Sequence, residues 1–527
     1  LRLQNENTFP VSDIKIDGLT ITEVRKNVTE NGVTTLELSV KPEKYYDSYE
    51  LQEISYQKAE TEKIYTTSVK IDLQFYKDIE SFEDWQKIST TDPENYRLIA
   101  DIDFSNKVNV NTGVVFNRLE GTDNGHTLKN LEIASTKAQV SFIKQINTSI
   151  SNVIFDNINI SSTGSGSYAG IILYTYGTIQ NLTFQNITVD APRVAYVGSI
   201  SQSYSTSIQN ITLSNITVSG NNQVAGFIGQ MSEANVDNIN LKTVKVVGSS
   251  SNVGGLIGTI SDYVSGSIKQ FNIEADDVHV VSTGGGNHGI LYGYGSASNS
   301  TIKNSSVDGY NRVGGMAGDT MYQLSYVTIE NCTISGIEEV GGIIGFSNLG
   351  IRNSYVSNST ISGKTSASKS VGGISGRSNN EILDSAIVHS TITNPGNNTG
   401  GIVGLGNCNV YRSSVYDCIV EGANYVGGVS GINSETGSRT IFRTIIQATI
   451  TASGTGSGGV LGYYQNNYSE SNVGRHTIYS NLIENSTISA SYNAGGLIGQ
   501  VDAMKTADAI YNNIIVANVE TTNDPST

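Results

Sequence analysis

The sequence contains little of what several protein classes require. Of its 527 residues only 6 are Pro, 5 are His, 3 are Cys and 1 is Trp, and 15% are charged. A disordered chain would carry more charge and proline, and three scattered cysteines make neither a disulfide framework nor a zinc knuckle. A helical bundle would need abundant Glu, Lys, Leu and Ala, whereas this chain is rich in Gly, Ser, Thr, Asn, Ile and Val, the residues of strands and turns. We therefore expect an all-β protein.

Positive charge and long apolar runs are also scarce. The chain has 32 Lys and Arg against 48 Asp and Glu, a net charge of −16, which argues against a nucleic-acid partner and against adsorption to anionic lipid. It contains no run of 18 apolar residues, so we expect no membrane insertion. It begins with Leu1 and shows no signal peptide, which favours a fragment of a longer protein.

A Gly-Gly hexad recurs along the chain. The clear copies are VGGLIG (253–258), VGGMAG (313–318), VGGIIG (340–345), VGGISG (371–376), TGGIVG (399–404), VGGVSG (426–431), SGGVLG (457–462) and AGGLIG (494–499). Weaker copies lie at 168–173, 196–201, 224–229 and 288–293. The copies follow one another at about 30 residues, the size of a solenoid repeat.

A second motif keeps the same period. An Asn precedes an apolar-Thr-apolar pattern, and this slot is filled by Asn157, Asn186, Asn215, Asn331, Asn358 and Asn485. Other coils fill the slot with Thr243, Asp277, His389, Asp417 and Gln447. Apolar residues precede the slot by two, four and seven positions, as Leu213, Ile211 and Ile208 do for Asn215.

Together the two motifs predict three short strands per unit: one after the Gly-Gly, one before the Asn and one after it. Strands of this kind, stacked coil on coil, make a right-handed parallel β-helix, which we expect from about residue 100 to 520. Twelve coils at ~4.8 Å each give a rod of ~58 Å. An Asn at a bend tolerates the left-handed region, and its amide can stack in a ladder with the coils above and below.

The first 150 residues differ. Residues 1–77 lack the hexad and contain alternating runs that predict a small β-sandwich or β-roll. A helix is predicted over 79–90, because Phe82, Trp85 and Ile88 share one face and Ser81 with Asp84 forms a capping-box-like start. We expect this helix to plug the first coil. The predicted boundaries are therefore 1–77, 78–150 for the capping helix and the first coils, 151–520 for the repeats, and 521–527 for a linker to a downstream domain.

Three stretches carry a family resemblance. SFEDWQKIS (81–89), NYRLIADIDFS (95–105) and FNRLEGTDNGHTLKNLEI (116–133) resemble the start of GLUG-repeat β-helices, and the VGGIIG hexads resemble GLUG motifs. With the opening block through KYYDSYELQEISY (44–56), the chain resembles the N-terminal region of the Gram-positive surface zinc metallopeptidases that include the immunoglobulin A1 protease.

The resemblance implies an extracellular, secreted virulence protein attached to the cell wall, with zinc held by HExxH in a C-terminal catalytic domain. The histidines here are His126, His279, His288, His389 and His476; none begins HExxH and no two lie four apart, so we expect neither catalysis nor a cofactor in this fragment.

The implied role is a non-catalytic substrate-docking and spacer region of a zinc metalloendopeptidase. It would act on host glycoproteins of the immunoglobulin or mucin type, in intramolecular contact with the downstream catalytic domain. Two alternatives stay open: a β-helical surface adhesin without a protease, and a β-helix polysaccharide hydrolase or lyase.

Outward hydroxyl residues form the candidate binding face. They lie two residues after the Asn slot, as Thr188, Thr217, Thr333, Thr360 and Thr391. The column is flat, polar and regular, so it suits a docking surface, although an ordinary exposed β face has the same pattern.

One acidic cluster surrounds a histidine. His279 follows Glu274, Asp276 and Asp277, which is compatible with a metal or general-acid site. Register favours a surface strand instead, because Asp277 takes the Asn slot and His279 then points outward with the threonines.

The other chemically reactive residues are predicted to be structural. His126 lies in a turn sequence, and Asp101 with Asp103 shares a strand face where a cation is the alternative. Cys332 and Cys418 take inward slots three coils apart, about 14 Å by coil rise. A disulfide needs Cα atoms within about 7 Å, so we expect free, buried thiols.

Overall fold

The protein is described from a computed structural model. It describes residues 76–122, 125–232, 234–261, 270–320, 322–433, 439–465, 476–502 and 508–522, and, ahead of these, the backbone of six strands.

Those six strands form one antiparallel sheet. They are β1 (Arg2–Gln4), β2 (Ile14–Ile16), β3 (Leu19–Glu30), β4 (Val33–Pro42), β5 (Gln52–Gln57) and β6 (Ile64–Val69). Their order in the sheet is β1-β4-β3-β2-β5-β6. The alternating runs of the opening block therefore pair with one another and not with the repeats. Residues 70–75 lie outside the described part.

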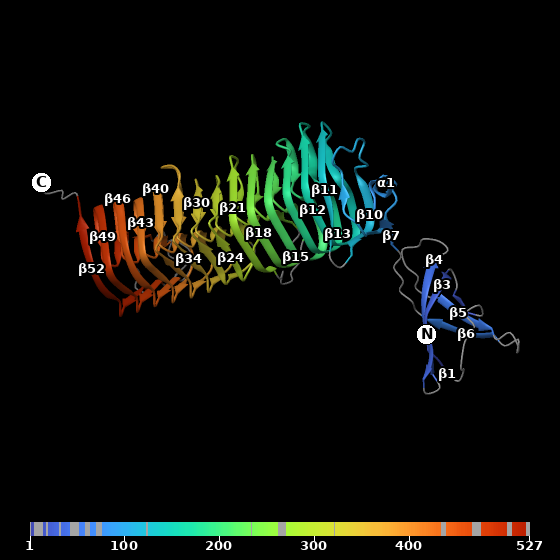
Figure 1. Ribbon diagram of the computed structural model, residues 1–527. Helices are drawn as coiled ribbons and strands as arrows, with labels where there is room; N and C mark the ends of the chain where they lie inside the picture. Colours follow the sequence, from blue (N-terminus) through green and yellow to red (C-terminus); the bar gives the residue numbers. More distant parts are fainter. Residues whose placement is uncertain are drawn as a thin grey trace, which may run out of the picture.

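The repeats wind into a parallel β-solenoid of about 13 turns with roughly 29 residues per coil, which confirms the predicted parallel β-helix. It runs from β7 (Lys77–Ile79) to β52 (Ile514–Thr521) as an elongated rod (Figure 1). The early coils contain long strands: β12 (Gln139–Ser162), β13 (Gly166–Asp190), β15 (Ile200–Gly220), β18 (Asn235–Gly248) and β21 (Gln270–Ser282). The late coils contain β40 (Thr391–Gly400), β43 (Ser414–Gly427), β46 (Ile445–Gly458) and β49 (Leu482–Gly495).

A middle coil shows how the two motifs divide the chain. It consists of β26 (Arg312–Gly314), β27 (Ala317–Thr320), β28 (Leu324–Ser325), β29 (Val327–Glu330) and β30 (Thr333–Gly336). The hexad is the bend between β26 and β27, and left-handed residues separate the later strands: Tyr326 (φ 56°) before β29 and Asn331 (φ 54°) before β30. The strands predicted after the Gly-Gly and on both sides of the Asn are present.

The Gly-Gly bend requires glycine because coils stack backbone on backbone there. A Cβ built on Gly341 would lie 2.1 Å from the carbonyl oxygen of Ile344 across the bend, and one on Gly342 would lie 2.1 Å from the carbonyl oxygen of Gly373 in the next coil. No side chain fits at either distance, so the hexad recurs in coil after coil.

The Asn slot is a column of left-handed residues. All six predicted members, Asn157, Asn186, Asn215, Asn331, Asn358 and Asn485, have φ between 46° and 55°. The Asn215 amide donates to the Asn186 Oδ1 at 2.8 Å, so the amides do stack from coil to coil. Among the replacements, Thr243, Asp277, His389 and Asp417 are also left-handed. Gln447 is not, so its assignment to the slot was wrong.

A second left-handed column lies five residues ahead of the first, and the sequence reasoning missed it. It includes Asn152, Asn181 and Asn210, and the Asn210 amide donates to the Asn181 Oδ1 at 2.8 Å. This column explains why two buried positions of each coil lie three residues apart, at seven and four residues before the slot, and not two apart as in a regular strand. Ile208 and Ile211 are both buried, and the left-handed Asn210 between them shifts the inward-outward alternation by one residue.

Small inward residues accompany the left-handed columns. The Cys332 backbone N–H donates to the Ser359 hydroxyl at 3.1 Å, and the Ser359 N–H donates to the Ser390 hydroxyl at 3.1 Å. Each left-handed residue interrupts the regular ladder of backbone hydrogen bonds. A serine from the next coil therefore satisfies the N–H that the interruption would leave unpaired inside the core.

The predicted cap is present but its helix is much shorter than predicted. Helix α1 is Phe82–Trp85 and not 79–90, because Ile79 belongs to strand β7. Asp84 N–H donates to the Ser81 hydroxyl at 3.2 Å, as the capping box predicts. Trp85 is fully buried and stacks on Phe142 with 4.5 Å between ring centroids, so one turn closes this end of the core.

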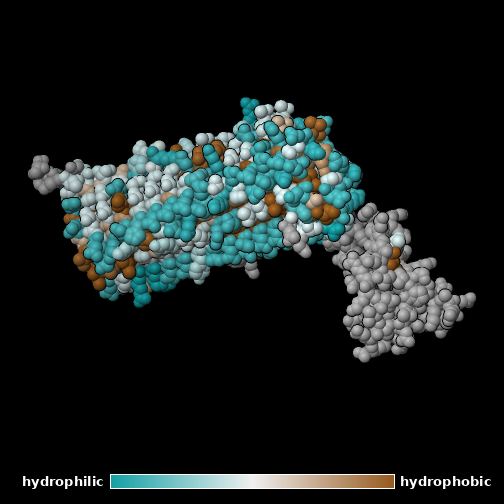
Figure 2. Space-filling view, viewed as in Figure 1, coloured by the Kyte–Doolittle hydropathy of each residue, from teal (hydrophilic) through white to brown (hydrophobic). Residues whose placement is uncertain are grey.

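At the opposite end of the described part of the rod, the last coil exposes apolar residues. In the last coil, inward-register Ile515 and Val519 are 43% and 42% exposed, whereas Ile483 and Ile488 one coil earlier are fully buried. Figure 2 shows apolar residues at this end of the rod. No helix of the described residues is long and apolar enough to cross a membrane.

Candidate functional site

The predicted hydroxyl face is a column in continuous register. The strands pair Thr188 with Thr217 and Thr333 with Thr360, and Thr360 pairs with Thr391. From Thr188 to Thr487 the column reads Thr188, Thr217, Lys245, His279, Ser306, Thr333, Thr360, Thr391, Ile419, Thr449 and Thr487. Its members are exposed or half-buried, so the face is available to a partner along most of the rod.

His279 points outward, as its register predicts. Val278 and Val280 are fully buried on either side of it. Its Nε2 lies 2.9 Å from the Asp277 Oδ1 and its Nδ1 lies 2.8 Å from the Ser306 hydroxyl. Both ring nitrogens are therefore engaged by neighbours within the surface.

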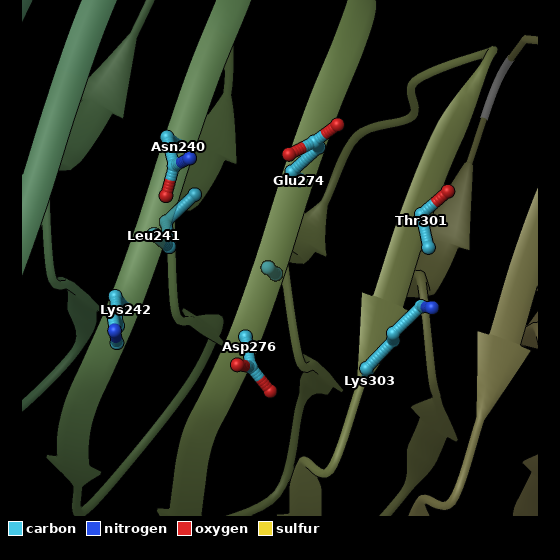
Figure 3. Close-up of a pocket in the computed structure, with 8 residues that line it drawn as sticks. Asn240, Leu241, Lys242, Glu274, Asp276, Thr301 and Lys303 are labelled. Carbon is cyan, nitrogen blue, oxygen red and sulfur yellow. The ribbon is translucent and has the colours of Figure 1, made fainter.

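Glu274 and Asp276 line a shallow hollow of about 480 Å³ on the strand before the slot (Figure 3). Two lysines from the flanking coils face it, because Lys242 and Lys303 pair in register with Asp276. The Asp276 Oδ1 also accepts from the Asn304 amide at 2.8 Å. The hollow is therefore lined by charges of both signs. The described residues contain no group of three or more His, Cys, Asp or Glu that could hold a metal ion.

His126, Asp101 and Asp103 form hydrogen bonds that tie the first coils together. His126 Nε2 lies 2.6 Å from the Thr122 hydroxyl, and Asp101 accepts from the Thr127 N–H at 2.9 Å. Asp103 accepts from the Asn130 amide and from the Ser105 N–H, and these bonds lower its pKa to about 2.

The three cysteines are free and buried. Burial raises the pKa of the Cys332 and Cys418 thiols to about 11 and that of the Cys408 thiol to about 12. The prediction of free, buried thiols for Cys332 and Cys418 is confirmed.

A charged cluster that the sequence reasoning missed lies at the mouth of the Gly-Gly bend. Arg312 binds Asp319 across the bend and Glu339 in the next coil, where Nε and Oε2 are 3.1 Å apart. Its guanidinium lies 4.4 Å from the centroid of the Phe346 ring. Burial raises the pKa of Asp319 although Arg312 opposes this shift. Each charge has a partner, so the cluster stabilises the bend.

A second hollow, of about 560 Å³, opens beside the hydroxyl face at coils β40, β43 and β46. It is lined by His389, Ser390, Thr391, Tyr416, Asp417, Cys418, Ile419, Gln447, Ala448, Thr449 and Asn485. His389 Nδ1 lies 2.9 Å from the Asp417 Oδ2, and the Tyr416 side chain is 45% exposed. Thr391 therefore belongs both to the predicted face and to the lining of this hollow.

No family model, curated protein or solved structure matches the chain.

Proposed function

We propose that this chain is the non-catalytic docking and spacer region of a secreted, cell-wall-associated zinc metalloprotease that acts on host glycoproteins. The proposal rests on the sequence resemblance to the surface metallopeptidases and on one structural observation. That observation is an elongated rod on which the column stays in register over eleven positions, eight of them Thr or Ser, with exposed tyrosines on the preceding strands.

The tyrosines provide contact area for a partner. Tyr355 and Tyr416 are 39% and 45% exposed on the strands that precede the slot, next to the hydroxyl column. Tyrosine is enriched at protein interfaces because it combines apolar area with a hydroxyl at low cost in side-chain entropy. A face of this composition suits a protein or glycan partner.

The exposed apolar residues of the last described coil suit an intramolecular neighbour. Ile514 and Val516 are 60% and 64% exposed next to the exposed core positions of the last coil, and the outer edge of β52 has no paired strand among the described residues. An exposed apolar strand edge of this kind is normally covered. In the proposed parent, the zinc-containing catalytic domain packs here, and zinc belongs to that domain alone.

Binding to immobilised secretory immunoglobulin A and mucin tests the proposal. The chain is expected to bind at least one of them and to leave both uncleaved on a denaturing gel. The double variant Thr333→Lys/Thr360→Lys places bulk and charge on the face and should weaken binding. Ser366→Lys/Ala367→Lys, on an exposed loop away from the face, should not.

Absence of binding to both glycoproteins would refute docking, and cleavage by the chain alone would refute the non-catalytic role.

A further inference from the structure

The ladder of left-handed residues lacks a rung inside the rod, at strand β46; the last strand, β52, lacks one as well, because Glu484 pairs with Val516 and Ser486 with Ala517. The described ladder is unbroken from Asn130 through His389 and Asp417, and it resumes at Asn485. In between, strand β46 has no residue opposite Asp417: Tyr416 pairs with Gln447 and Cys418 pairs with Ala448. This coil is one residue shorter than its neighbours at this corner, and the hollow of about 560 Å³ lies there.

The two residues that border the missing rung are short of partners. Asp417 makes one side-chain hydrogen bond among the described residues, to His389 on the side away from the gap, and its side chain is 75% exposed. Asn485 makes no side-chain hydrogen bond within the described part of the chain. Two coil rises, about 10 Å, separate their backbones, so one planar amide-sized group fits between a carboxylate acceptor and an amide donor.

Apolar side chains lie beside the gap, where the repeat elsewhere has polar ones. Ile419 is 43% exposed and interrupts the hydroxyl column between Thr391 and Thr449. Tyr416 is 45% exposed in the same coil. Exposed Ile and Tyr next to unsatisfied polar groups are the usual composition of a small-molecule subsite.

We propose that this hollow binds the acetamido group of an N-acetylhexosamine. The missing rung is an amide in a ladder of amides, and an acetamido group has the same donor and acceptor. Its N–H donates to Asp417, its carbonyl accepts from Asn485, and its methyl group packs on Ile419. The pyranose ring then lies toward Tyr416, because the apolar face of a sugar stacks on aromatic rings.

The inference rests on the proposed function, and it names the chemical group that is recognised on the host glycoprotein. Both immunoglobulin and mucin glycans contain N-acetylhexosamines, so a subsite for this group would select glycosylated partners.

Saturation-transfer NMR tests it with four free sugars. N-acetylglucosamine and N-acetylgalactosamine are the probes, and glucose and galactose are the controls without the acetamido group. We expect saturation of the two acetylated sugars, strongest at the acetyl methyl, with dissociation constants of about 1 mM. Equal saturation of all four sugars, or of none, would overturn the proposal.

Three variants locate the site. Asp417→Asn should weaken binding of N-acetylglucosamine about tenfold, because a charge-assisted acceptor is lost. Asp277→Asn is its matched control, since Asp277 also occupies the left-handed slot beside a histidine but has no gap next to it. Insertion of one Asn after Gln447 restores the rung and should abolish binding. Tyr416→Ala should also weaken binding. Because it changes an exposed residue and leaves the backbone intact, it tests the site even if the insertion variant does not fold.

The outcomes separate this site from the docking function. If Asp417→Asn weakens binding of the acetylated sugars but not of the glycoproteins, the subsite is supported and docking occurs elsewhere; if Asp417→Asn leaves binding of the acetylated sugars unchanged, the subsite is refuted. If it binds the acetylated sugars but neither glycoprotein, the subsite is supported and the docking function fails.

Discussion

His288 should make the rod sensitive to acid. It occupies the inward slot that its register neighbours Val253 and Val313 fill, and it is fully buried. Its Nε2 lies 3.1 Å from the Gly284 carbonyl, so Nε2 carries the proton, and its Nδ1 has no hydrogen-bond partner in the described residues. The ring is thus held neutral inside the core.

The free energy needed to protonate the buried His288 ring sets how much stability the protein loses in acid. Burial lowers the His288 pKa from 6.5 to about 4; the hydrogen bond to Gly284 and the charge of Asp308 oppose the shift, and Lys364 adds to it. The difference corresponds to about 3 kcal/mol. Because the folded pKa is lowered, the unfolded chain takes up the proton first. Stability is therefore unaffected by this residue above pH 6.5 and falls as the pH drops toward 4.

Urea unfolding of wild type and His288→Val, followed by circular dichroism from pH 7.5 to 4, measures the effect. The free energy of unfolding of the variant should exceed that of wild type by about 3 kcal/mol more at pH 4 than at pH 7.5. His279→Thr changes a half-exposed histidine and is the control, for which no comparable divergence is expected. Parallel pH profiles for wild type and His288→Val would refute the buried, neutral imidazole.

Three further predictions concern the repeat itself. Gly342→Ala should lower the free energy of unfolding by at least about 3 kcal/mol, because its Cβ would lie 2.1 Å from a backbone oxygen. The control is Gly285→Ala, whose Cβ would lie 3.2 Å from a side-chain amide nitrogen. This control should change the free energy of unfolding by less than about 0.5 kcal/mol. Asn215→Ala should cost about 2 kcal/mol in urea unfolding, since it loses the ladder bond and puts at φ 55° an Ala, which lacks the polar side chain that lets Asn adopt the left-handed region. Asn215→Gly should cost less, and equal losses would contradict the left-handed assignment. The three buried thiols should not react with an aromatic disulfide reagent in the folded protein and should all react in urea, and rapid reaction of the native protein would show that the core is more open than described.

The core of the rod was predictable because its rules are local and repeated. A buried stripe two and four residues before the slot, a Gly pair at each bend and a left-handed Asn recur in nearly every coil, so errors in one coil are corrected by the others. The cap had no such repetition. Phe82, Trp85 and Ile88 are spaced as on a helix, but α1 ends at Trp85, and Ile88 is buried beyond the end of the helix.

The candidate hollow could be found only by comparing the coils in the three-dimensional structure. Gln447 seemed to occupy the Asn slot because it lies two residues before the outward Thr449, as Asn485 lies before Thr487. The buried Ile446 directly precedes Gln447, whereas its register partner Val415 lies two residues before Asp417. Strand pairing shows that the slot is empty there. The exposure of Tyr416 and Ile419 likewise follows from which coil lies beside them.

By itself the sequence determined the architecture: the period, the inward positions and the bends, because each coil must satisfy the same stacking conditions as the coils beside it. Only the tertiary structure decided where the repeat departs from itself. A missing rung and a neutral histidine in a valine column are properties of neighbouring coils taken together, since burial and unpaired polar groups depend on contacts between segments about 30 residues apart.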